Sequence, residues 1–242
     1  MLKDEQDAFG HAIWDYYHYR KGFEIVERDD GFFDVSSGPT TYFREYIHWD
    51  EYERKSIDYV RGNVLDIGSG AGRAALFLQR GGVDVTCLDN SPLAIEVCKL
   101  RGVRKTEVLP LTKISSKLGT FDTIVMFGNN FGLCGNHKRA EWLLKKFHSI
   151  TSESGRIIAA TRDPYKTMVP EHLWYHEFNK KRGRPAGQLR IRIRYQKYVT
   201  PWFDLLFLSQ EEMEDLLDGS GWFVRKFIDG EGGMYTAILE KK

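Results

Sequence analysis

Residues 63–78 constrain the fold of this chain more than any other segment. Their sequence, NVLDIGSGAGRAALFL, is typical of a buried strand, a glycine-rich turn and the start of a helix. The glycines of the turn are Gly68, Gly70 and Gly72, at its first, third and fifth positions. The dinucleotide-binding fingerprint has its third glycine at the sixth position, which Arg73 occupies here. The turn therefore has the architecture of a nucleotide-binding loop with a different glycine spacing.

Short apolar runs alternate with amphipathic stretches from residue 63 onward, which predicts βαβ units. The expected strands are 63–67, 84–88, 106–109, 121–127 and 155–161, with an antiparallel pair, 223–228 and 234–239, at the edge. The expected helices are 72–80, 92–101 and 138–150. The connection 110–120 is too short and polar for a full helix. The predicted fold class is α/β, a Rossmann-like, doubly wound and mostly parallel seven-stranded sheet with an antiparallel C-terminal strand pair.

Two further regions surround this pattern. Residues 1–60 are rich in aromatic side chains and predict a helical lid that lies on the sheet, separate from the main domain of residues 61–242. Residues 162–208 predict an insertion within that domain. Its strand-like runs, 189–198 and 202–208, are expected to join near Thr200 and Pro201 and to pair as a β-hairpin. Ser209 and Glu212 then form a capping box before a helix that ends at a glycine.

Composition narrows the class of protein. Hydrophobic residues at 42% and charged residues at 29% are ordinary for a folded soluble domain. The N-terminus has no secretory pattern, and no apolar run approaches the roughly 18 residues of a membrane span. Cys87, Cys98 and Cys134 are scattered, which favours a reducing compartment. We therefore expect a cytoplasmic protein with no membrane partner, and a net charge of +1 gives no general attraction to nucleic acid.

Two carboxylates indicate which ligand the turn holds. Asp89 ends the second predicted strand, 21 residues after Gly68, where an acidic side chain meets a ribose diol. NAD and S-adenosylmethionine both satisfy this position. Asp66 precedes the turn by two residues, where its charge would oppose a pyrophosphate but attract an ammonium group. A bulky Arg73 also replaces the glycine that packs helix on strand in dinucleotide sites. The turn therefore favours a ligand with a cationic end.

An ordered set of motifs extends over residues 60–242. It comprises LDIGSGAG, CLDNSP, FDTIVMFGNNFG, SGRIIAATRDP and a terminal SGWF…GGMYTAILEK. This set resembles the class I S-adenosylmethionine-dependent methyltransferases, and within them the bacterial small-molecule type. The resemblance implies S-adenosyl-L-methionine as cofactor and methyl transfer as the activity.

The resemblance also implies the positions that hold the cofactor. The methionine end of the cofactor would lie against the glycine turn and be covered by Tyr42. The ribose would meet Asp89, and the adenine would have apolar or backbone contacts. These cofactor-binding positions are Asp66, Gly68, Ser69, Gly70, Gly72, Asp89, Asn90, Ser91, Leu111, Phe127, Asn129 and Tyr42. The loop with Leu111 lacks the acidic residue that accepts from the adenine amine in many members.

The segment after the fourth strand bears on the methyl acceptor. It carries no Asn/Asp-Pro-Pro-aromatic motif and no Pro-Cys nucleophile, and it lacks the acids of a magnesium site, so we expect no metal. By analogy with the family, these absences exclude several other acceptors. The ordered motif set with Asp66 and Asp89 is the basis for expecting an oxygen or nitrogen of a small-molecule acceptor, with Asn130 and Arg192 as substrate-binding candidates. Cys134 is expected to be a buried, inert thiol. No catalytic residue stands out; His137 and Tyr16 are candidates for a general base, although a capping or packing role is favoured for both.

Residues 180–197 form the one strongly basic window. Strand alternation places Arg190, Arg192 and Arg194 on one face and Ile191 and Ile193 on the other. The arginine row is interpreted as the solvated face of an edge strand, as a clamp for an acidic small substrate, or as a phosphate-binding surface for RNA. An RNA or other nucleic-acid methyltransferase is thus the alternative function, and a non-catalytic cofactor-binding domain is a third.

His172 and His176 are spaced four residues apart, as metal ligands on a helix would be. A third ligand is not evident in the sequence, so we expect a surface helix there instead.

Overall fold

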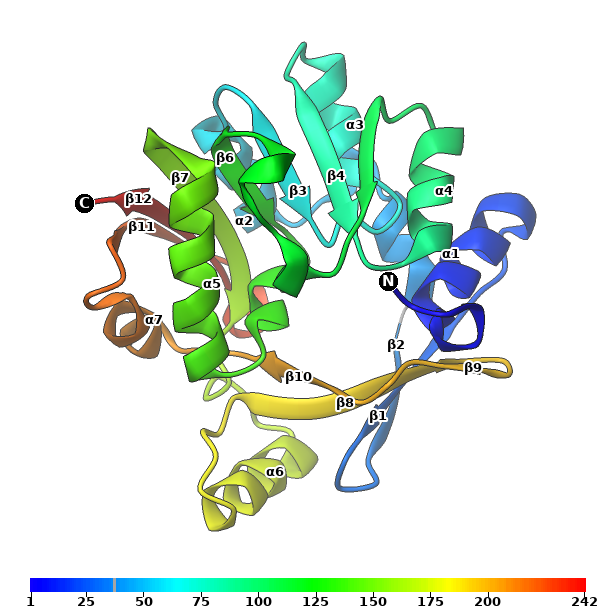
Figure 1. Cartoon of the computed structure of the whole chain (residues 1–242). Helices are drawn as coiled ribbons and strands as arrows, with labels where there is room; N and C mark the ends of the chain where they lie inside the picture. Colours follow the sequence, from blue (N-terminus) through cyan, green and yellow to red (C-terminus); the bar gives the residue numbers. More distant parts are fainter. Residues whose placement is uncertain (37) are drawn as a thin grey trace. The chain divides into compact units, whose positions relative to one another are not determined.

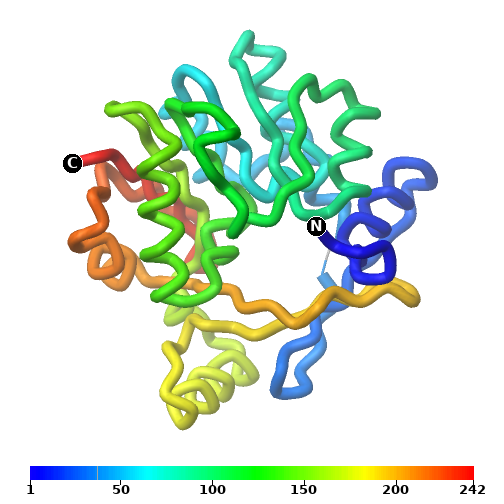
Figure 2. The backbone as a smooth tube through the Cα atoms, viewed as in Figure 1, coloured from blue at the N-terminus to red at the C-terminus, as the bar shows by residue number. Residues whose placement is uncertain are grey.

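The computed structural model describes residues 1–36 and 38–242 (Figures 1 and 2). The chain forms two compact units, each built from three segments. The first unit consists of residues 1–49, 61–114 and 191–202, and the second of residues 50–60, 115–190 and 203–242.

A seven-stranded sheet has the order β11-β12-β7-β6-β3-β4-β5. Its strands are β3 (Val64–Ile67), β4 (Val85–Asp89), β5 (Lys105–Val108), β6 (Phe121–Met126), β7 (Thr151–Arg162), β11 (Trp222–Asp229) and β12 (Met234–Lys241). The pairs β3–β4, β4–β5 and β6–β7 are parallel, whereas β12 is antiparallel to both β7 and β11. The predicted fold class is therefore confirmed, although β7 begins four residues before the expected strand.

Two helices connect the parallel strands of the first unit, α3 (Arg73–Arg80) and α4 (Pro92–Leu100). The N-terminal helix α1 (Ala8–Tyr19) packs on α4 and on the glycine turn, where Ile13 meets Ala71, Ala94 and Val97. The aromatic residues Trp14, Tyr17, Tyr42 and Phe43 surround this cluster. Helix α1 thus buries apolar residues against α4 and the glycine turn.

A second sheet was only partly predicted. Its order is β10-β8-β1-β2, with β9 paired to β8. The strands are β1 (Glu24–Arg28), β2 (Phe33–Ser36), β8 (Gln188–Tyr195), β9 (Tyr198–Val199) and β10 (Phe203–Leu206). The chain reverses directly after β8, where Tyr195 pairs with Tyr198 and Gln196 adopts a φ of 51°, rather than at Thr200 and Pro201. The hairpin of β1 and β2 within the expected lid was not predicted.

The helices of the second unit are α2 (Glu51–Ser56), α5 (His137–Ile150), α6 (Pro170–Lys181) and α7 (Gln210–Leu217), and α5 packs against β7 and α7 (Figure 1). The predicted capping box is present at α7, where the Glu212 amide donates to Ser209 Oγ at 3.1 Å and the Ser209 amide donates to Glu212 Oε2 at 2.9 Å. Residues 110–120 contain only short 3-10 turns, as expected. Within residues 1–36 and 38–242, helices fall short of the length and apolarity that a membrane crossing requires.

Candidate functional site

The glycine turn owes its shape to left-handed backbone. Gly68, Gly70 and Gly72 have φ angles of 68°, 53° and 76°, a region that residues with a Cβ rarely occupy. The turn is closed by the Gly72 amide, which donates to the Ser69 carbonyl at 2.8 Å, and it is tied to β4 by the Gly68 amide, which donates to the Leu88 carbonyl at 2.8 Å. The three glycines are therefore required by the backbone itself.

Gly72 also explains the unusual spacing. A Cβ at this position would lie 2.9 Å from Val103 Cγ2 and 3.0 Å from Cys98 Sγ, so Gly72 is the residue that lets the start of α3 approach α4. Arg73, one position later, extends away, and its guanidinium lies 4.7 Å from the centre of the Trp49 ring. The close-packing position is thus the fifth of the turn, which leaves room for a bulky residue at the sixth.

Asp89 joins the glycine turn to the loop after β4. Its Oδ2 accepts from the Gly70 amide at 3.0 Å, and its Oδ1 accepts from the Ser91 amide at 3.0 Å. Burial raises the pKa of Asp89 to about 6, although these two hydrogen bonds act in the opposite direction. Each carboxylate oxygen can still accept a second hydrogen bond, so Asp89 can hold the turn and receive a ligand's hydroxyl groups at once.

Ser91 belongs to a buried network that the sequence analysis missed. Its Oγ accepts from the Ala94 amide at 3.0 Å, which caps α4, and donates to Asp7 Oδ2 at 2.9 Å. Asp7 also accepts from the Gly10 amide at 3.0 Å and so caps α1. A Cβ on Gly10 would collide with both Asp7 and Ser91. One carboxylate therefore serves two helix N-termini, and the Ser91 side chain is committed to the fold.

Tyr42 lies over the glycine turn, the position that was expected for it. A Cβ on Gly70 would lie 3.5 Å from Tyr42 Cδ1, so the ring covers the turn at contact distance. Its hydroxyl donates to Glu24 Oε2 at 3.2 Å. Burial and the neighbouring carboxylate Glu24 hold the pKa of Tyr42 well above its usual value, so the phenol remains a hydrogen-bond donor.

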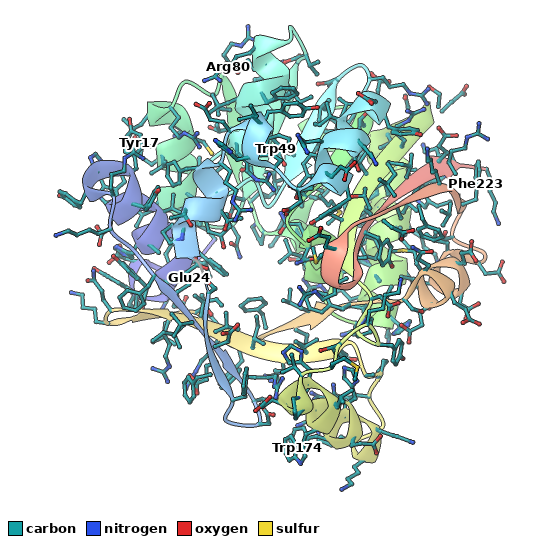
Figure 3. The ribbon with its side chains drawn as sticks, turned by 180° about the vertical axis from the view of Figure 1, so that it is seen from behind. Tyr17, Glu24, Trp49, Arg80, Trp174 and Phe223 are labelled. Carbon is teal, nitrogen blue, oxygen red and sulfur yellow. The ribbon has the colours of Figure 1, made fainter. Side chains whose placement is uncertain are left out.

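Glu24 was missed by the sequence analysis. It opens β1 beside the turn that carries Tyr42 (Figure 3), and only 3% of its surface is exposed. Its Oε2 also accepts from Ser36 Oγ at 3.3 Å. Burial raises the pKa of Glu24 to about 7, against the two hydrogen bonds, which lower it. Its Oε1 is buried and has no hydrogen-bond partner among the residues that the structure describes.

The remaining predicted residues of the first unit have different degrees of burial. Asp66, in β3, is 3% exposed, and Ser69 is also buried. Leu111 is partly buried at the start of a 3-10 turn, and Asn90 is exposed. The structure thus joins Gly70, Asp89 and Tyr42 by direct contacts, whereas the cofactor contacts of all the predicted residues stay predictions.

In the second unit, the loop after β6 is built on left-handed backbone as well. Gly128 and Asn129 have φ angles of 64° and 67°, and the Gly128 amide donates to the buried Glu53 Oε1 at 2.9 Å. Asn129 accepts through its carbonyl from Gly132 at 2.9 Å, while its side-chain Oδ1 is buried without a hydrogen-bond partner in the described part of the chain. Phe127 is buried, and the Asn130 amide donates to its carbonyl at 3.2 Å. Glu53 is a second anchor that the sequence analysis missed.

The candidate reactive side chains have ordinary surroundings. Cys134 is fully buried and burial raises its pKa to about 12, so the thiol is inert, as expected. Tyr16 packs beside Phe43, with ring centres 4.9 Å apart, and His137 is the first residue of α5. In residues 1–36 and 38–242, groups of three His, Cys, Asp or Glu side chains suited to a metal ion do not occur. His172 and His176 lie on α6.

The arginine row corrects one expectation. Strand β8 lies between β10 and β1, so it is not an edge strand, and its face is not simply solvated. Arg192 pairs in register with Glu27 and donates to it through two nitrogens, at 2.6 and 2.7 Å. Arg194 donates to Glu27 as well, and Arg190 donates to Asp204 at 3.4 Å. The alternation assigns Leu189, Ile191, Ile193 and Tyr195 to the opposite face. Ile191, Ile193 and Tyr195 are buried as predicted, whereas Leu189 is partly buried.

Comparison with known proteins agrees with this geometry. Residues 64–155 match a family model described as a methyltransferase domain. A S-adenosylmethionine-dependent methyltransferase from Bacteroides fragilis, crystallised with S-adenosyl-L-homocysteine, is 27% identical, with 100% of this chain and 97% of that chain covered and a TM-score of 0.84. No curated protein matches the chain significantly in sequence.

Two more distant structures share the fold. A S-adenosylmethionine-dependent methyltransferase from Methanosarcina mazei is 16% identical, covers 80% of this chain and 99% of its own, and has a TM-score of 0.61. The 1,6-didemethyltoxoflavin-N1-methyltransferase of Burkholderia thailandensis, with 1,6-didemethyltoxoflavin and S-adenosylhomocysteine bound, is also 16% identical, with 84% of each chain covered and a TM-score of 0.51. With the methyltransferase domain at residues 64–155 and the similarity over the whole length to the Bacteroides protein, the chain has the features of a S-adenosylmethionine-dependent methyltransferase.

Proposed function

We propose that this enzyme transfers a methyl group from S-adenosylmethionine to an oxygen or nitrogen atom of a small-molecule acceptor. The observation that carries the proposal is the Asp89 carboxylate, which accepts from Gly70 and Ser91 and so fixes the glycine turn beside a hydroxyl-binding group. When bound, the cofactor supplies a methyl group that its sulfonium already activates. The protein therefore needs to hold the cofactor, orient the acceptor and receive a proton.

The residues of the first unit fit this cofactor. Three left-handed glycines leave the backbone of the turn without Cβ atoms, so a ligand can approach it closely. Asp66 would supply negative charge for the methionine ammonium, and Tyr42 contacts the turn at Gly70. Asp89 would accept from the ribose hydroxyls. Ser69 and Gly68 would contribute backbone contacts, and Asn90, Ser91 and Leu111 would line the adenine.

The loop after β6, in the second unit, has ligand-binding features of its own. The Asn129 Oδ1 atom is buried without a hydrogen-bond partner among the described residues, so a ligand that donates there would satisfy it. Phe127 offers an apolar surface, and Asn130 would orient the acceptor.

The arginine row supports a small-molecule acceptor over a nucleic acid. Arg192 and Arg194 share the carboxylate of Glu27, and Arg190 pairs with Asp204, so two carboxylates offset two of the three positive charges. Arg192 also lies over the Trp202 ring at 4.6 Å. A phosphate backbone would have to break these pairs before it could bind. Arg192 remains a candidate acceptor contact only through the guanidinium nitrogen that Glu27 does not occupy.

Calorimetric titration with S-adenosylhomocysteine tests the proposal. We expect the wild-type protein to bind it and Asp89→Ala to bind about tenfold more weakly or worse, because a charged hydrogen-bond acceptor is lost. Asp84→Ala is the matched control: it lies just before β4, in an exposed ion pair with Lys105, and should bind like the wild type. Unchanged binding in Asp89→Ala, or binding of NADH in place of S-adenosylhomocysteine, would contradict the proposal.

A further inference from the structure

The Glu24 carboxylate has one oxygen, Oε1, without a hydrogen-bond partner within the described residues. The residue is 3% exposed. A buried carboxylate oxygen that has lost its water and gained no donor costs free energy. Such a group is retained where a ligand supplies the missing donor.

The other oxygen fixes how the carboxylate is held. Glu24 faces Ser36 across the β1–β2 ladder, and Oε2 accepts from both Ser36 Oγ and the Tyr42 hydroxyl. Ser36 Oγ is itself positioned by the Gly38 amide, which donates to it at 3.1 Å. With Oε2 fixed by two donors, Oε1 has a defined direction.

Tyr42 connects this carboxylate to the cofactor turn. Its hydroxyl contacts Glu24, and its ring lies 3.5 Å from the point that a Cβ added to Gly70 would occupy. A single tyrosine side chain therefore separates Oε1 from the backbone on which the methionine end of the cofactor would rest.

We propose that Glu24 Oε1 accepts a hydrogen bond from the N–H or O–H group of the methyl acceptor and takes its proton; this inference rests on the proposed function. Methylation of an acceptor X–H forms a carbon–X bond from the lone pair of X and breaks the sulfur–carbon bond, whose electron pair stays on sulfur. The proton of X–H passes to Oε1, so the carboxylate becomes a carboxylic acid. The acceptor class is an amine or an acidic hydroxyl, since an anionic carboxylate acceptor would be repelled.

The surroundings of Glu24 suit this role. Besides burial, the groups that act on its pKa are Tyr42 and Ser36, neither of which is a cation. The pKa of about 7 leaves the carboxylate ionised at mildly alkaline pH and able to hold a proton near neutrality, as a general base requires. Tyr42 cannot be the base, because its pKa is raised well above the usual value. Asp89 is engaged with Gly70 and Ser91.

Sinefungin and S-adenosylhomocysteine are suitable probes, because sinefungin carries a primary amine where the cofactor carries its methyl group and S-adenosylhomocysteine has nothing there. The readout is the ratio of their affinities by calorimetry at pH 8. We expect this ratio to fall about tenfold in Glu24→Gln, while the affinity for S-adenosylhomocysteine changes little. Asp34→Asn, an exposed carboxylate on β2, is the matched control and should keep the wild-type ratio.

The wild-type protein provides a second measurement that needs no variant. Its affinity ratio should rise from pH 6 to pH 8 as Glu24 ionises, and the titration of Asp89 affects both ligands alike. An unchanged ratio in Glu24→Gln, or a ratio independent of pH in the wild type, would overturn the proposal. An equal loss of both ligands in the variant would also overturn it, by assigning Glu24 to the cofactor. Failure of the wild type to bind S-adenosylhomocysteine would instead refute the proposed function itself.

Discussion

Glu24 and Glu27 lie three residues apart on β1, and both are buried. Glu27 receives hydrogen bonds from Arg192 and Arg194, and the Arg192 hydrogen bond is the main cause that lowers its pKa to about 2. Glu24 has two neutral donors and no cation, and burial raises its pKa to about 7. The two carboxylates ionise in opposite ways, because burial dominates at Glu24, whereas the hydrogen bond from Arg192 dominates at Glu27. Glu27 is a structural ion pair, whereas Glu24 has the unsatisfied group expected of a binding site.

The largest expected effect concerns the pH dependence of stability at Glu24. The folded pKa of Glu24, about 7, lies above the ordinary 4.5. Its contribution to the free energy of unfolding is therefore fully present below pH 4.5 and is lost as the pH rises through 7. Relative to Glu24→Gln, the wild type should lose about 3 kcal/mol of unfolding free energy between pH 4 and pH 8. Denaturant unfolding at both pH values measures this difference. A constant difference would mean that Glu24 titrates normally.

Glu27→Gln should show the opposite sign. The folded pKa of Glu27 is depressed, so its contribution is present above pH 4.5 and is lost as the pH falls toward 2. At pH 7 we expect a loss of about 2 kcal/mol, since two partly exposed guanidinium groups remain without their carboxylate. Glu51→Gln breaks an exposed ion pair with Lys55 and serves as the control, which should leave the denaturation midpoint unchanged. An equal effect of both variants would show that burial adds nothing to the Glu27 pair.

The smallest effect separates the two arginines that share Glu27. Arg192→Met should cost about 1 kcal/mol, because it removes a bidentate pair and the contact with Trp202. Arg194→Met should cost less, because Glu27 keeps both hydrogen bonds from Arg192. Chemical denaturation of the two variants at low and high salt measures both losses of unfolding free energy and tests whether Arg192→Met costs more than Arg194→Met. A larger loss for Arg194→Met would contradict the bidentate geometry as the source of stability.

Patterns in neighbouring residues of the sequence predicted the glycine turn and the strand and helix on either side of it. The strand, glycine turn and helix around Gly68–Gly72 follow from the backbone conformations of adjacent residues, whereas the close packing at Gly72 involves the distant Cys98 and Val103. The Asp89 and Tyr42 positions relative to the turn were also anticipated, whereas the contacts of both residues with the cofactor stay predictions. The glycine turn could be predicted because only a few backbone conformations form such a turn.

The missed features depend on distant partners. Strand β8 pairs with β1 across more than half of the chain, so nothing near Arg192 indicates that Glu27 neutralises it. The hairpin of β1 and β2 had a usable signal, the Asp29-Asp30-Gly31 turn between two strand-like runs, which the aromatic residues around it obscured. Once that hairpin is assigned, Glu24 becomes a candidate, because it would then be a carboxylate on a buried strand.

The carboxylate shared by two helices has a consequence during synthesis. Asp7 contacts Ser91, 84 residues later, and α1 buries its apolar face mainly on α4. Because a ribosome makes roughly 5 to 20 residues per second, α1 waits several seconds before α4 exists. Until Leu100 has been added, α1 can contact Phe43 through Tyr16 and Tyr17 but lacks the α4 surface, and Asp7 caps a single helix. Helix α1 is therefore synthesised well before the helix against which it buries its apolar face.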